Sequence, residues 1–142
     1  MSADEQAIRA LFESWSLSDE ELANVHAVVE RLLDPDVTYE EDPVWPGAMT
    51  MTGSREVVDR FLEYRELLGR TSATIEVLRD AGEGRWAAAV RLAGESASGA
   101  PWDHLWGYRL ETHEGRVKAL RAFFDAARPF AELGLPVEPL KN

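Results

Sequence analysis

Apolar residues recur at helical spacing in the first part of the chain. Ser2 and Glu5 have the spacing of a capping box, and apolar positions three or four residues apart follow them. Ser18 and Glu21 repeat this arrangement ahead of a second apolar stripe, which stops at Asp34-Pro35 because the residue before a proline disfavours helix. The pattern predicts two helices, the second folded back on the first.

A short strand and a third helix are predicted next. The segment Val37–Glu41 has the pattern of a short strand, and the prolines and glycine of residues 43–47 indicate a loop after it. Ser54 is expected to cap the third helix, whose buried face ends near Gly69.

The second half of the chain has the pattern of a β-sheet. Its segments are rich in β-branched, aromatic and apolar residues and are separated by glycine-bearing turns. The four predicted strands are Thr74–Arg79, Arg85–Ala93, Trp102–Glu111 and Val117–Phe124. A final helical turn is expected within Ala126–Leu133. Helices followed by an antiparallel meander predict an α+β domain, in which a curved sheet around helices leaves a cone-shaped hollow suited to a pocket.

Composition and charge narrow the range of partners. The 142 residues, 45% of them hydrophobic, are enough for a single domain over residues 1–142 with a core and a cavity. Twenty-six acidic against fifteen basic residues give a net charge of −11, which disfavours nucleic acid and membrane surfaces and favours neutral or cationic ligands. No apolar run approaches a membrane span and the N-terminus is acidic, so a cytoplasmic protein is expected.

Metal and thiol chemistry are not expected. The chain has no cysteine, which removes disulfides, thiolate nucleophiles and cysteine-ligated metals. Its histidines, His26, His104 and His113, lack the spacing of a metal-binding motif. We therefore expect neither a metal nor a cofactor.

Two polar clusters interrupt the apolar strands. The first is Tyr39-Glu40-Glu41-Asp42-Pro43, and the second is Trp102-Asp103-His104-Leu105-Trp106. Burying three acids beside an aromatic ring, or a histidine and an aspartate between tryptophans, is costly and needs a reason. The clusters indicate a pocket for a small hydrophobic ligand or substrate.

The order of these motifs resembles the SnoaL-like branch of the nuclear-transport-factor-2-like superfamily. The resemblance rests on residues 34–37, 39–47 and 53–56 and resumes at residues 104–106, 114–117 and 120–125. It implies a cone-shaped, curved antiparallel sheet wrapped around N-terminal helices, also called a cystatin-like α+β barrel, and a homodimer through the outer sheet face. It leaves the chemistry open, because the superfamily includes polyketide cyclases, ketosteroid isomerases, epoxide hydrolases and binding proteins.

Two mechanisms of the family lack their residues in this chain. SnoaL-type cyclases and limonene epoxide hydrolases place a working aspartate on the last strand, where this chain has Ala122. The hydrolases also carry Arg-x-Asp on the middle strand, where Arg91-Leu92-Ala93 has no acid. Neither reaction follows from the resemblance.

The ketosteroid isomerases are more similar at these positions. Glu41-Asp42-Pro43-Val44 and Asp103-His104 look like their motifs on the first and fourth strands, and they also have a small apolar residue where Ala122 lies. Their tyrosine donor aligns with Phe12, so Tyr39 or Tyr64 would have to replace it. The resemblance implies a base aspartate that works opposite a neutral acid.

The alternation of side chains along a strand predicts which residues of each cluster face the pocket. It places Glu41 on the same face as Tyr39, whereas the isomerase motif selects Asp42, which a bulge before Pro43 would turn inward. Both acids therefore remain candidates. On the fourth strand the aromatic face carries His104, and the isomerase register selects Asp103 instead. We favour His104, because the opposite register would expose a row of large aromatics.

The leading hypothesis is a cofactor-independent enzyme that transfers a proton. Glu41 or Asp42 would remove a proton next to a carbonyl, and His104, helped by Tyr39, would donate to the enolate oxygen. Burial and mutual charge would tune both pKa values toward neutrality. The reaction would be an isomerisation or aldol-type cyclisation of a hydrophobic carbonyl compound in natural-product metabolism. The expected substrate contacts are Trp45, Phe61, Tyr64, Trp102, Trp106, Tyr108, Leu120 and Phe124.

Other interpretations remain open at this point. The acids of the first cluster could be a solvated strand end, His104 a satisfied core histidine, and Asp103 a turn or rim residue. The aromatic face could be core or subunit interface. The protein could also bind a hydrophobic ligand without catalysis, or could be a hydrolase or dehydratase that activates water with Glu41 or Asp42.

Overall fold

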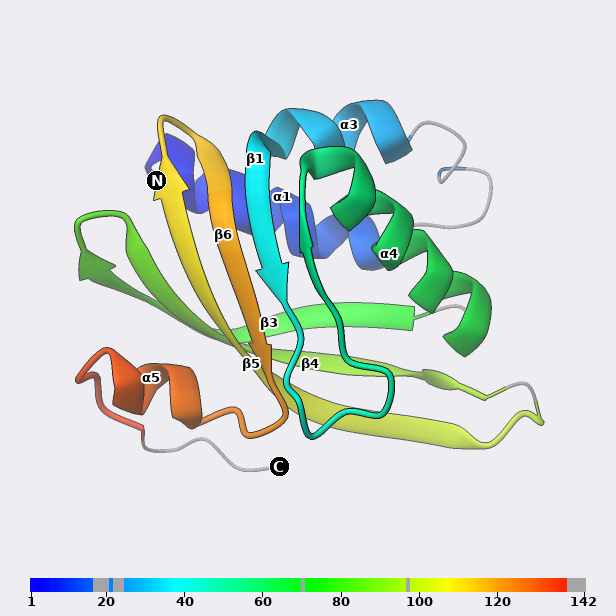
Figure 1. The fold of residues 1–142 in the computed structure, drawn as a ribbon. Helices are drawn as coiled ribbons and strands as arrows, with labels where there is room; N and C mark the ends of the chain where they lie inside the picture. Colours follow the sequence, from blue (N-terminus) through cyan, green and yellow to red (C-terminus); the bar gives the residue numbers. More distant parts are fainter. Residues whose placement is uncertain (17–20, 22–24, 70, 97, 138–142) are drawn as a thin grey trace.

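The structure is a computed structural model that describes residues 1–142 except 17–20, 22–24, 70, 97 and 138–142 (Figure 1). The elements are α1 (Ala3–Glu13), η1 (Ser14–Ser16), α3 (Val25–Leu32), β1 (Leu33–Glu40), β2 (Thr50–Thr52), α4 (Ser54–Leu68), β3 (Thr71–Gly82), β4 (Arg85–Glu95), β5 (Pro101–His113), β6 (Arg116–Phe123) and α5 (Arg128–Glu132). The structure is α+β, as predicted: α1 and α3 come first, two strands precede α4, and the other four strands follow it.

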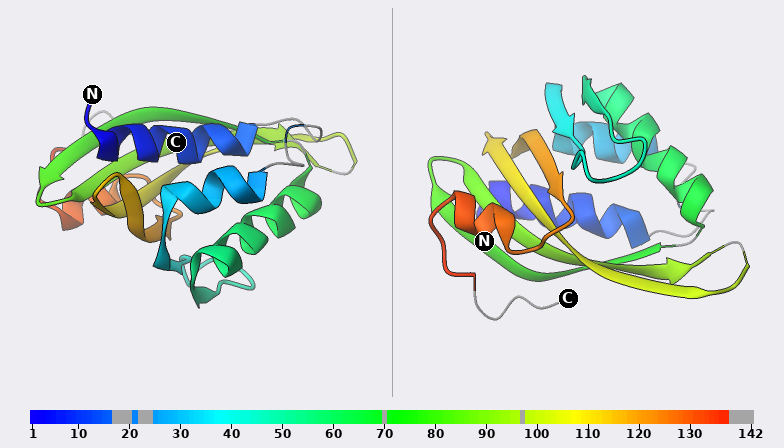
Figure 2. Two further views of the ribbon diagram at one scale, coloured as in Figure 1. Left: turned by 90° about the horizontal axis from the view of Figure 1, so that it is seen from above. Right: turned by 60° about the horizontal axis from the view of Figure 1, so that its bottom comes forward.

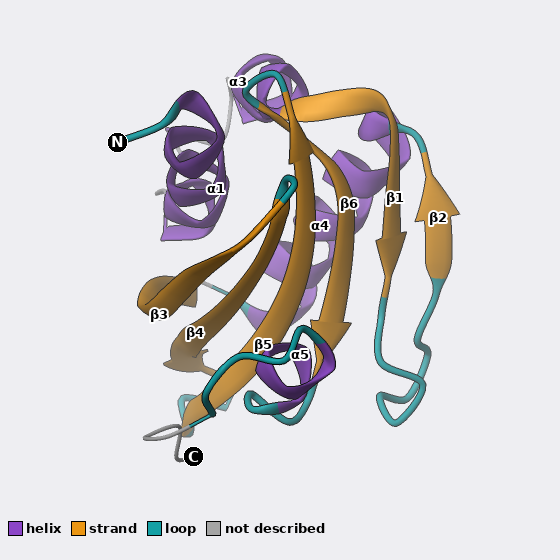
Figure 3. Ribbon diagram, turned by 90° about the vertical axis from the view of Figure 1, so that its left-hand side faces the viewer, coloured by secondary structure: helices purple, strands orange, loops and turns teal. Residues whose placement is uncertain are grey.

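The six strands form one curved, open sheet in the order β2-β1-β6-β5-β4-β3. Helices α1, α3 and α4 lie on one side of the sheet, whereas α5 packs on the opposite face against β4 and β5 (Figures 1 and 2). Figure 3 shows β2 and β3 at the two edges. The expected curved antiparallel sheet is confirmed with one exception, since β1 runs parallel to β6.

The predicted first helix is confirmed, together with its cap. The Ser2 hydroxyl accepts a hydrogen bond from the Glu5 amide at 3.1 Å. The cap expected at Ser18 lies outside the described residues. Ser54 does not cap α4: it is the first helical residue, and Gly53 is the N-cap without a side-chain hydrogen bond. No helix in the described part of the chain is long and apolar enough to cross a membrane.

The start of the sheet differs from the prediction in two respects. Helix α3 ends at Leu32 and β1 begins at Leu33, so Asp34-Pro35 lies inside the strand instead of between helix and strand. Strand β2 was not predicted, because its three residues Thr50–Thr52 carry too short a pattern to distinguish from a loop. Pairing of Tyr39 with Met51 and of Glu40 with Thr50 makes it a strand.

Two apolar cores lie on the two faces of the sheet. The larger core joins α1, through buried residues such as Ile8 and Phe12, to inward-facing residues of the strands such as Val90 and Leu110. The smaller core lies under α5 and holds Ala87, Ala89, Leu105, Ala126 and Phe130.

Helix α5 approaches β5 closely at Gly107. A Cβ atom at that position would lie 2.7 Å from Cδ of Pro129 and 2.9 Å from the carbonyl oxygen of Asp125. Real Cβ contacts are longer, so the helix could pack here only over a residue without a side chain.

We expect Gly107→Ala to lower the free energy of unfolding by about 2 kcal/mol, because the new methyl group displaces Pro129. Urea denaturation followed by tryptophan fluorescence measures this change. Adding Pro129→Ala to the same chain removes the ring atoms nearest the new methyl group and should recover part of the loss. An unchanged stability of Gly107→Ala would contradict the close packing of α5.

Candidate functional site

A cavity of about 370 Å³ lies among the helices, the loop after β1 and the inward face of the sheet, and its lining is mostly apolar. The structure brings together in its wall all but one of the residues singled out in the sequence. These are Tyr39, Glu41, Asp42, Trp45, Phe61, Tyr64, Trp102, Asp103, His104, Trp106, Tyr108 and Phe124. Leu120 is the exception, since it is 2% exposed within the core and does not line the cavity.

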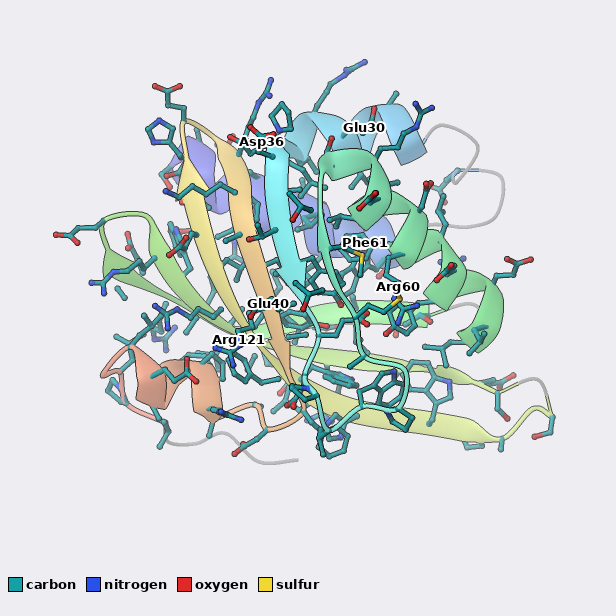
Figure 4. All side chains as sticks on the ribbon, in the orientation of Figure 1. Glu30, Asp36, Glu40, Arg60, Phe61 and Arg121 are labelled. Atoms are coloured by element: carbon teal, nitrogen blue, oxygen red, sulfur yellow. The ribbon has the colours of Figure 1, made fainter. Side chains whose placement is uncertain are left out.

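Glu41 is held by an arginine that the sequence analysis did not single out. Arg60 of α4 donates to both carboxylate oxygens, from Nε to Oε2 at 3.1 Å and from Nη2 to Oε1 at 2.8 Å. The Met49 amide donates to Oε1 at 2.9 Å. Both charged side chains are buried, with 15% of Arg60 and 3% of Glu41 exposed. Figure 4 shows Arg60 and Phe61 on the side of α4 that faces β1.

The ion pair determines the protonation state of Glu41. Burial acts to raise the pKa of Glu41, but hydrogen bonds from Arg60, Tyr64 and the Met49 amide outweigh it, and the net pKa is lowered from 4.5. The expected tuning toward neutrality does not occur at this carboxylate. Glu41 is therefore an ionised, fully engaged anion and a weak base.

The same arginine fastens the loop that follows β1. Nη2 of Arg60 also donates to the carbonyl oxygen of Gly47 at 3.0 Å. At the base of the loop, the Glu41 amide donates to the carbonyl oxygen of Met49 at 3.0 Å. The loop thereby holds Trp45 against Trp106, with ring centroids 5.5 Å apart.

Strand β1 ends at Glu40, so the alternation of faces stops before the two candidate acids. Glu41 and Asp42 both line the cavity as a result. The Asp42 carboxylate accepts hydrogen bonds from two backbone amides, that of Val44 at 3.1 Å and that of Phe124 at 2.9 Å. Among the described residues, no ion pair joins Asp42 to a basic side chain, so its charge is not neutralised as that of Glu41 is.

His104 and Asp42 bind the same residue of the wall. Nε2 of His104 lies 2.8 Å from the carbonyl oxygen of Phe124, and because a carbonyl only accepts, this nitrogen carries the proton. The imidazole is also stacked on the Phe124 ring at 4.0 Å. The backbone of Phe124 is thus held at two points: its N–H by Asp42 and its C=O by His104.

Asp103 reaches the cavity only at its rim. Its side chain is 57% exposed and pairs with Arg91 at 2.6 Å, and Arg91 also binds Glu76 at 2.6 Å. Both carboxylates raise the pKa of Arg91, first Glu76 and then Asp103. The structure thus places Asp103 at the rim, in an ion-pair network with Arg91 and Glu76.

Three tyrosines in the wall remain neutral donors. Burial raises the pKa of Tyr39, Tyr64 and Tyr108, and the charge of Glu41 adds to the effect in each case. Tyr39 and Tyr64 also form hydrogen bonds with Glu41. Tyr108 is different, because it is 3% exposed and no hydrogen bond joins its hydroxyl to any described residue.

Sequence reasoning missed several residues of this site. Arg60, the ion-pair partner of Glu41, lies 19 positions away along the chain. Trp15 contributes a ring 5.8 Å from that of Tyr108, although its helical spacing indicated only core. Other apolar residues of the wall that were not singled out are Val29, Val58, Leu62, Leu68 and Leu92. The sequence carried no signal for the role of Arg60, because this residue lies among other charged residues of the helix and also pairs with Glu63 three positions away, at 2.9 Å.

The described residues include no cluster of three or more histidines and acids that could hold a metal ion.

Removing Arg60, the partner of Glu41, should lower the stability of the fold more than removing one partner of an exposed ion pair. We expect Arg60→Met to lower the free energy of unfolding by about 3 kcal/mol, because a buried carboxylate loses its counter-ion. Arg9→Met is the matched control, since its pair with Glu5 is much more exposed than that of Arg60 with Glu41 and should be worth under about 1 kcal/mol. Urea unfolding measures both, and the double change Glu41→Leu with Arg60→Met should be more stable than Arg60→Met alone. Equal losses in the free energy of unfolding for Arg60→Met and Arg9→Met would contradict the role of Arg60 as the counter-ion of a buried carboxylate.

The lowered pKa of Glu41 gives stability a defined dependence on pH. Since the folded pKa lies below the unfolded value of 4.5, the stabilisation is complete above that pH and is lost as the pH falls through the folded pKa. We expect the stability advantage of the native chain over Glu41→Gln to shrink on acidification through this range. Urea unfolding of both proteins in a pH series tests it, and a constant difference would refute it.

Comparisons with known proteins identify the fold. Neither a protein-family profile nor a curated protein matches the chain. Among solved structures, it is similar to a hypothetical protein of ketosteroid isomerase-like fold from Catenulispora acidiphila in complex with trimethylamine, with a TM-score of 0.71, 16% identity, and coverage of 96% of this chain and 98% of that one.

Two further similar structures cover most of the chain. TerC co-crystallised with polyporic acid has a TM-score of 0.73 and 16% identity over 93% of this chain and 98% of that one. A putative SnoaL-like polyketide cyclase from Jannaschia sp. CCS1 has a TM-score of 0.70 and 16% identity over 85% and 84%. At this identity the likeness establishes the fold alone, and the protein has the nuclear-transport-factor-2-like fold shared by ketosteroid isomerase-like and SnoaL-like proteins.

Proposed function

We propose that the protein binds a hydrophobic carbonyl compound in the cavity and isomerises or cyclises it by proton transfer without a cofactor. The carrying observation is the hydroxyl of Tyr108, a neutral donor on a buried side chain that lines an apolar cavity and has no hydrogen bond to a described residue. A ligand carbonyl oxygen in the cavity would accept a hydrogen bond from this hydroxyl.

Tyr108 is a neighbour of Phe12, the position that aligns with the tyrosine donor of the isomerases. Its ring packs on that of Phe12, with centroids 5.0 Å apart, and its strand neighbour on β6 is the small Ala122. The hydroxyls of Tyr39 and Tyr64 are already bound to Glu41 and are less available to a ligand. We therefore assign to Tyr108 the donor role expected at His104 and Tyr39.

Asp42 is the better candidate for the base. It lines the cavity without a basic partner among the described residues, whereas Glu41 is neutralised by Arg60. In the proposed step, Asp42 takes the proton from the carbon next to the carbonyl. The electron pair of that C–H bond forms the enolate, whose oxygen accepts a hydrogen bond from Tyr108. In an isomerisation Asp42 then returns the proton to a carbon of the ligand. In a cyclisation the enolate carbon attacks a second carbonyl, whose C=O π bond breaks to give an alkoxide that takes the proton from Asp42.

His104 has a positioning role in this proposal. It holds Phe124 by the carbonyl oxygen and by ring stacking, and Phe124 in turn donates its N–H to Asp42. Loss of His104 would therefore release one of the two amides that orient the base.

Small molecules bind to other proteins of this fold. TerC was crystallised with polyporic acid, and the Catenulispora acidiphila protein with trimethylamine. The rings of Trp45, Trp106 and Phe124 give this cavity flat apolar walls, which supports a planar or polycyclic ligand here.

Deuterium uptake at the carbons next to the carbonyl tests the proposal. Steroid enones, polyketide-like ketones and aromatic ketones are incubated in D₂O and followed by NMR. We expect wild-type exchange of at least one ketone and losses of about a hundredfold or more in Asp42→Asn and Tyr108→Phe, since each removes one reacting group. If Asp42→Asn exchanged deuterium as fast as wild type, Asp42 would not be the base, and if Tyr108→Phe did so, Tyr108 would not be the donor.

Tyr39→Phe is the matched control for Tyr108→Phe. Both changes delete one hydroxyl from a buried tyrosine of the same cavity, but the Tyr39 hydroxyl already serves Glu41. We expect Tyr39→Phe to retain most of the exchange, and unfolding curves of each variant show whether the fold survives. Equal losses in both would indicate a general effect on the cavity.

A non-catalytic binding protein is the second candidate. It is favoured by the two backbone amides on Asp42, which account for that carboxylate as a structural tie between the ends of β1 and β6. It predicts ketones that bind and lose affinity in Tyr108→Phe but exchange no deuterium above background.

A further inference from the structure

A second hollow adjoins the cavity at the open end of the sheet. This hollow, here called the rim groove, is lined by Ser16, residues 71–72, residues 93–96 and residues 101–103. It is more open than the cavity, and polar atoms make up a larger share of its surface. Thr71, Trp102 and Asp103 line both spaces, so the two meet at these residues.

Trp102 forms part of the wall between the two spaces. Its indole Nε1 is buried and has no hydrogen-bond partner among the described residues. A buried indole N–H usually finds an acceptor, and its absence costs free energy. An oxygen atom of a ligand that passes from the cavity into the rim groove would supply this acceptor after a small turn of the ring.

The groups of the rim groove favour one class of ligand. Its described lining has hydroxyls on Ser16, Thr71, Ser72 and Ser96, carboxylates on Glu95 and Asp103, and no basic side chain. Asp103 accepts from Arg91 through Oδ1, and its side chain is still 57% exposed. Arg91 is already shared between Asp103 and Glu76, so carboxylates outnumber free cations among the described groups around the groove. Such surroundings suit a neutral group with many hydroxyls and repel phosphate, sulfate or carboxylate.

We propose that the ligand of the cavity carries a neutral polyhydroxylated group, such as a sugar, that extends past Trp102 into the rim groove. There the Trp102 indole donates to one ligand oxygen, and Asp103 and the hydroxyl side chains bind the ligand hydroxyls. This inference rests on the proposed function, because it requires an apolar part of the same molecule in the cavity. It adds the substrate class: a glycosylated or similarly hydroxylated aromatic or polycyclic compound.

Three naphthalene derivatives test the inference by isothermal titration calorimetry. Methoxynaphthalene has only the apolar part, naphthyl β-D-glucoside adds the neutral sugar, and naphthyl β-D-glucuronide replaces the sugar's hydroxymethyl group with a carboxylate. We expect the glucoside to bind about tenfold more tightly than methoxynaphthalene, which corresponds to one or two net hydrogen bonds. The glucuronide should bind about tenfold more weakly than the glucoside, because its carboxylate faces Asp103 and Glu95.

Variants separate the rim groove from the cavity. Trp102→Phe keeps an aromatic ring but removes the N–H, and it should cut the preference for glucoside over methoxynaphthalene about fivefold. Trp106→Phe is the matched control, since Trp106 lines the cavity and not the rim groove. It should change the affinities for both ligands by the same factor and leave the preference intact.

Several outcomes would overturn this inference. They are equal affinities for glucoside and methoxynaphthalene, a preference that survives Trp102→Phe unchanged, tighter binding of the glucuronide, or no binding of any probe. Failure of the proposed function is distinguishable, because deuterium exchange uses ketones without a sugar. A protein that prefers the glucoside but exchanges no ketone retains this site and loses only the proton-transfer step.

Discussion

The ion pair between Glu41 and Arg60 organises the site. It joins the end of β1 to α4, and through Gly47 and Met49 it fixes the loop that carries Trp45 to the cavity. Two charges are removed from water at this point, and the attraction offsets that cost only because hydrogen bonds also satisfy the carboxylate. The pair sets the shape of the wall and takes Glu41 out of the set of reactive groups.

Neutralising Glu41 leaves few polar groups for a ligand to contact. Asp42 accepts hydrogen bonds from two backbone amides, Tyr108 has a hydroxyl without a partner among the described residues, and His104 binds the carbonyl oxygen of Phe124. In an apolar cavity each of these groups interacts strongly, because little water competes for its hydrogen bonds. A donor and a base in such surroundings suit chemistry in which charge develops on a carbonyl oxygen.

The curvature of the sheet makes room for this cavity. Helices α1, α3 and α4 cover one side of the sheet, and the strands bend around them (Figure 2). Small side chains such as Ala122 lie on the inner face, whereas α5 packs on the outer face where Gly107 permits close approach. The outer face also carries the charged pair of Arg121 with Glu40, which Figure 4 shows on neighbouring strands.

The sequence by itself determined the α+β class, α1 with its cap, and the approximate positions of β3 to β6, because these depend on local periodicity and turn residues. It also named most residues of the cavity wall, since aromatic residues on one strand face must share a side of the sheet. Only the tertiary structure decided that β1 pairs in parallel with β6, that Arg60 neutralises Glu41 and that the Tyr108 hydroxyl is left without a partner among the described residues. These depend on contacts between distant segments, which no local pattern encodes.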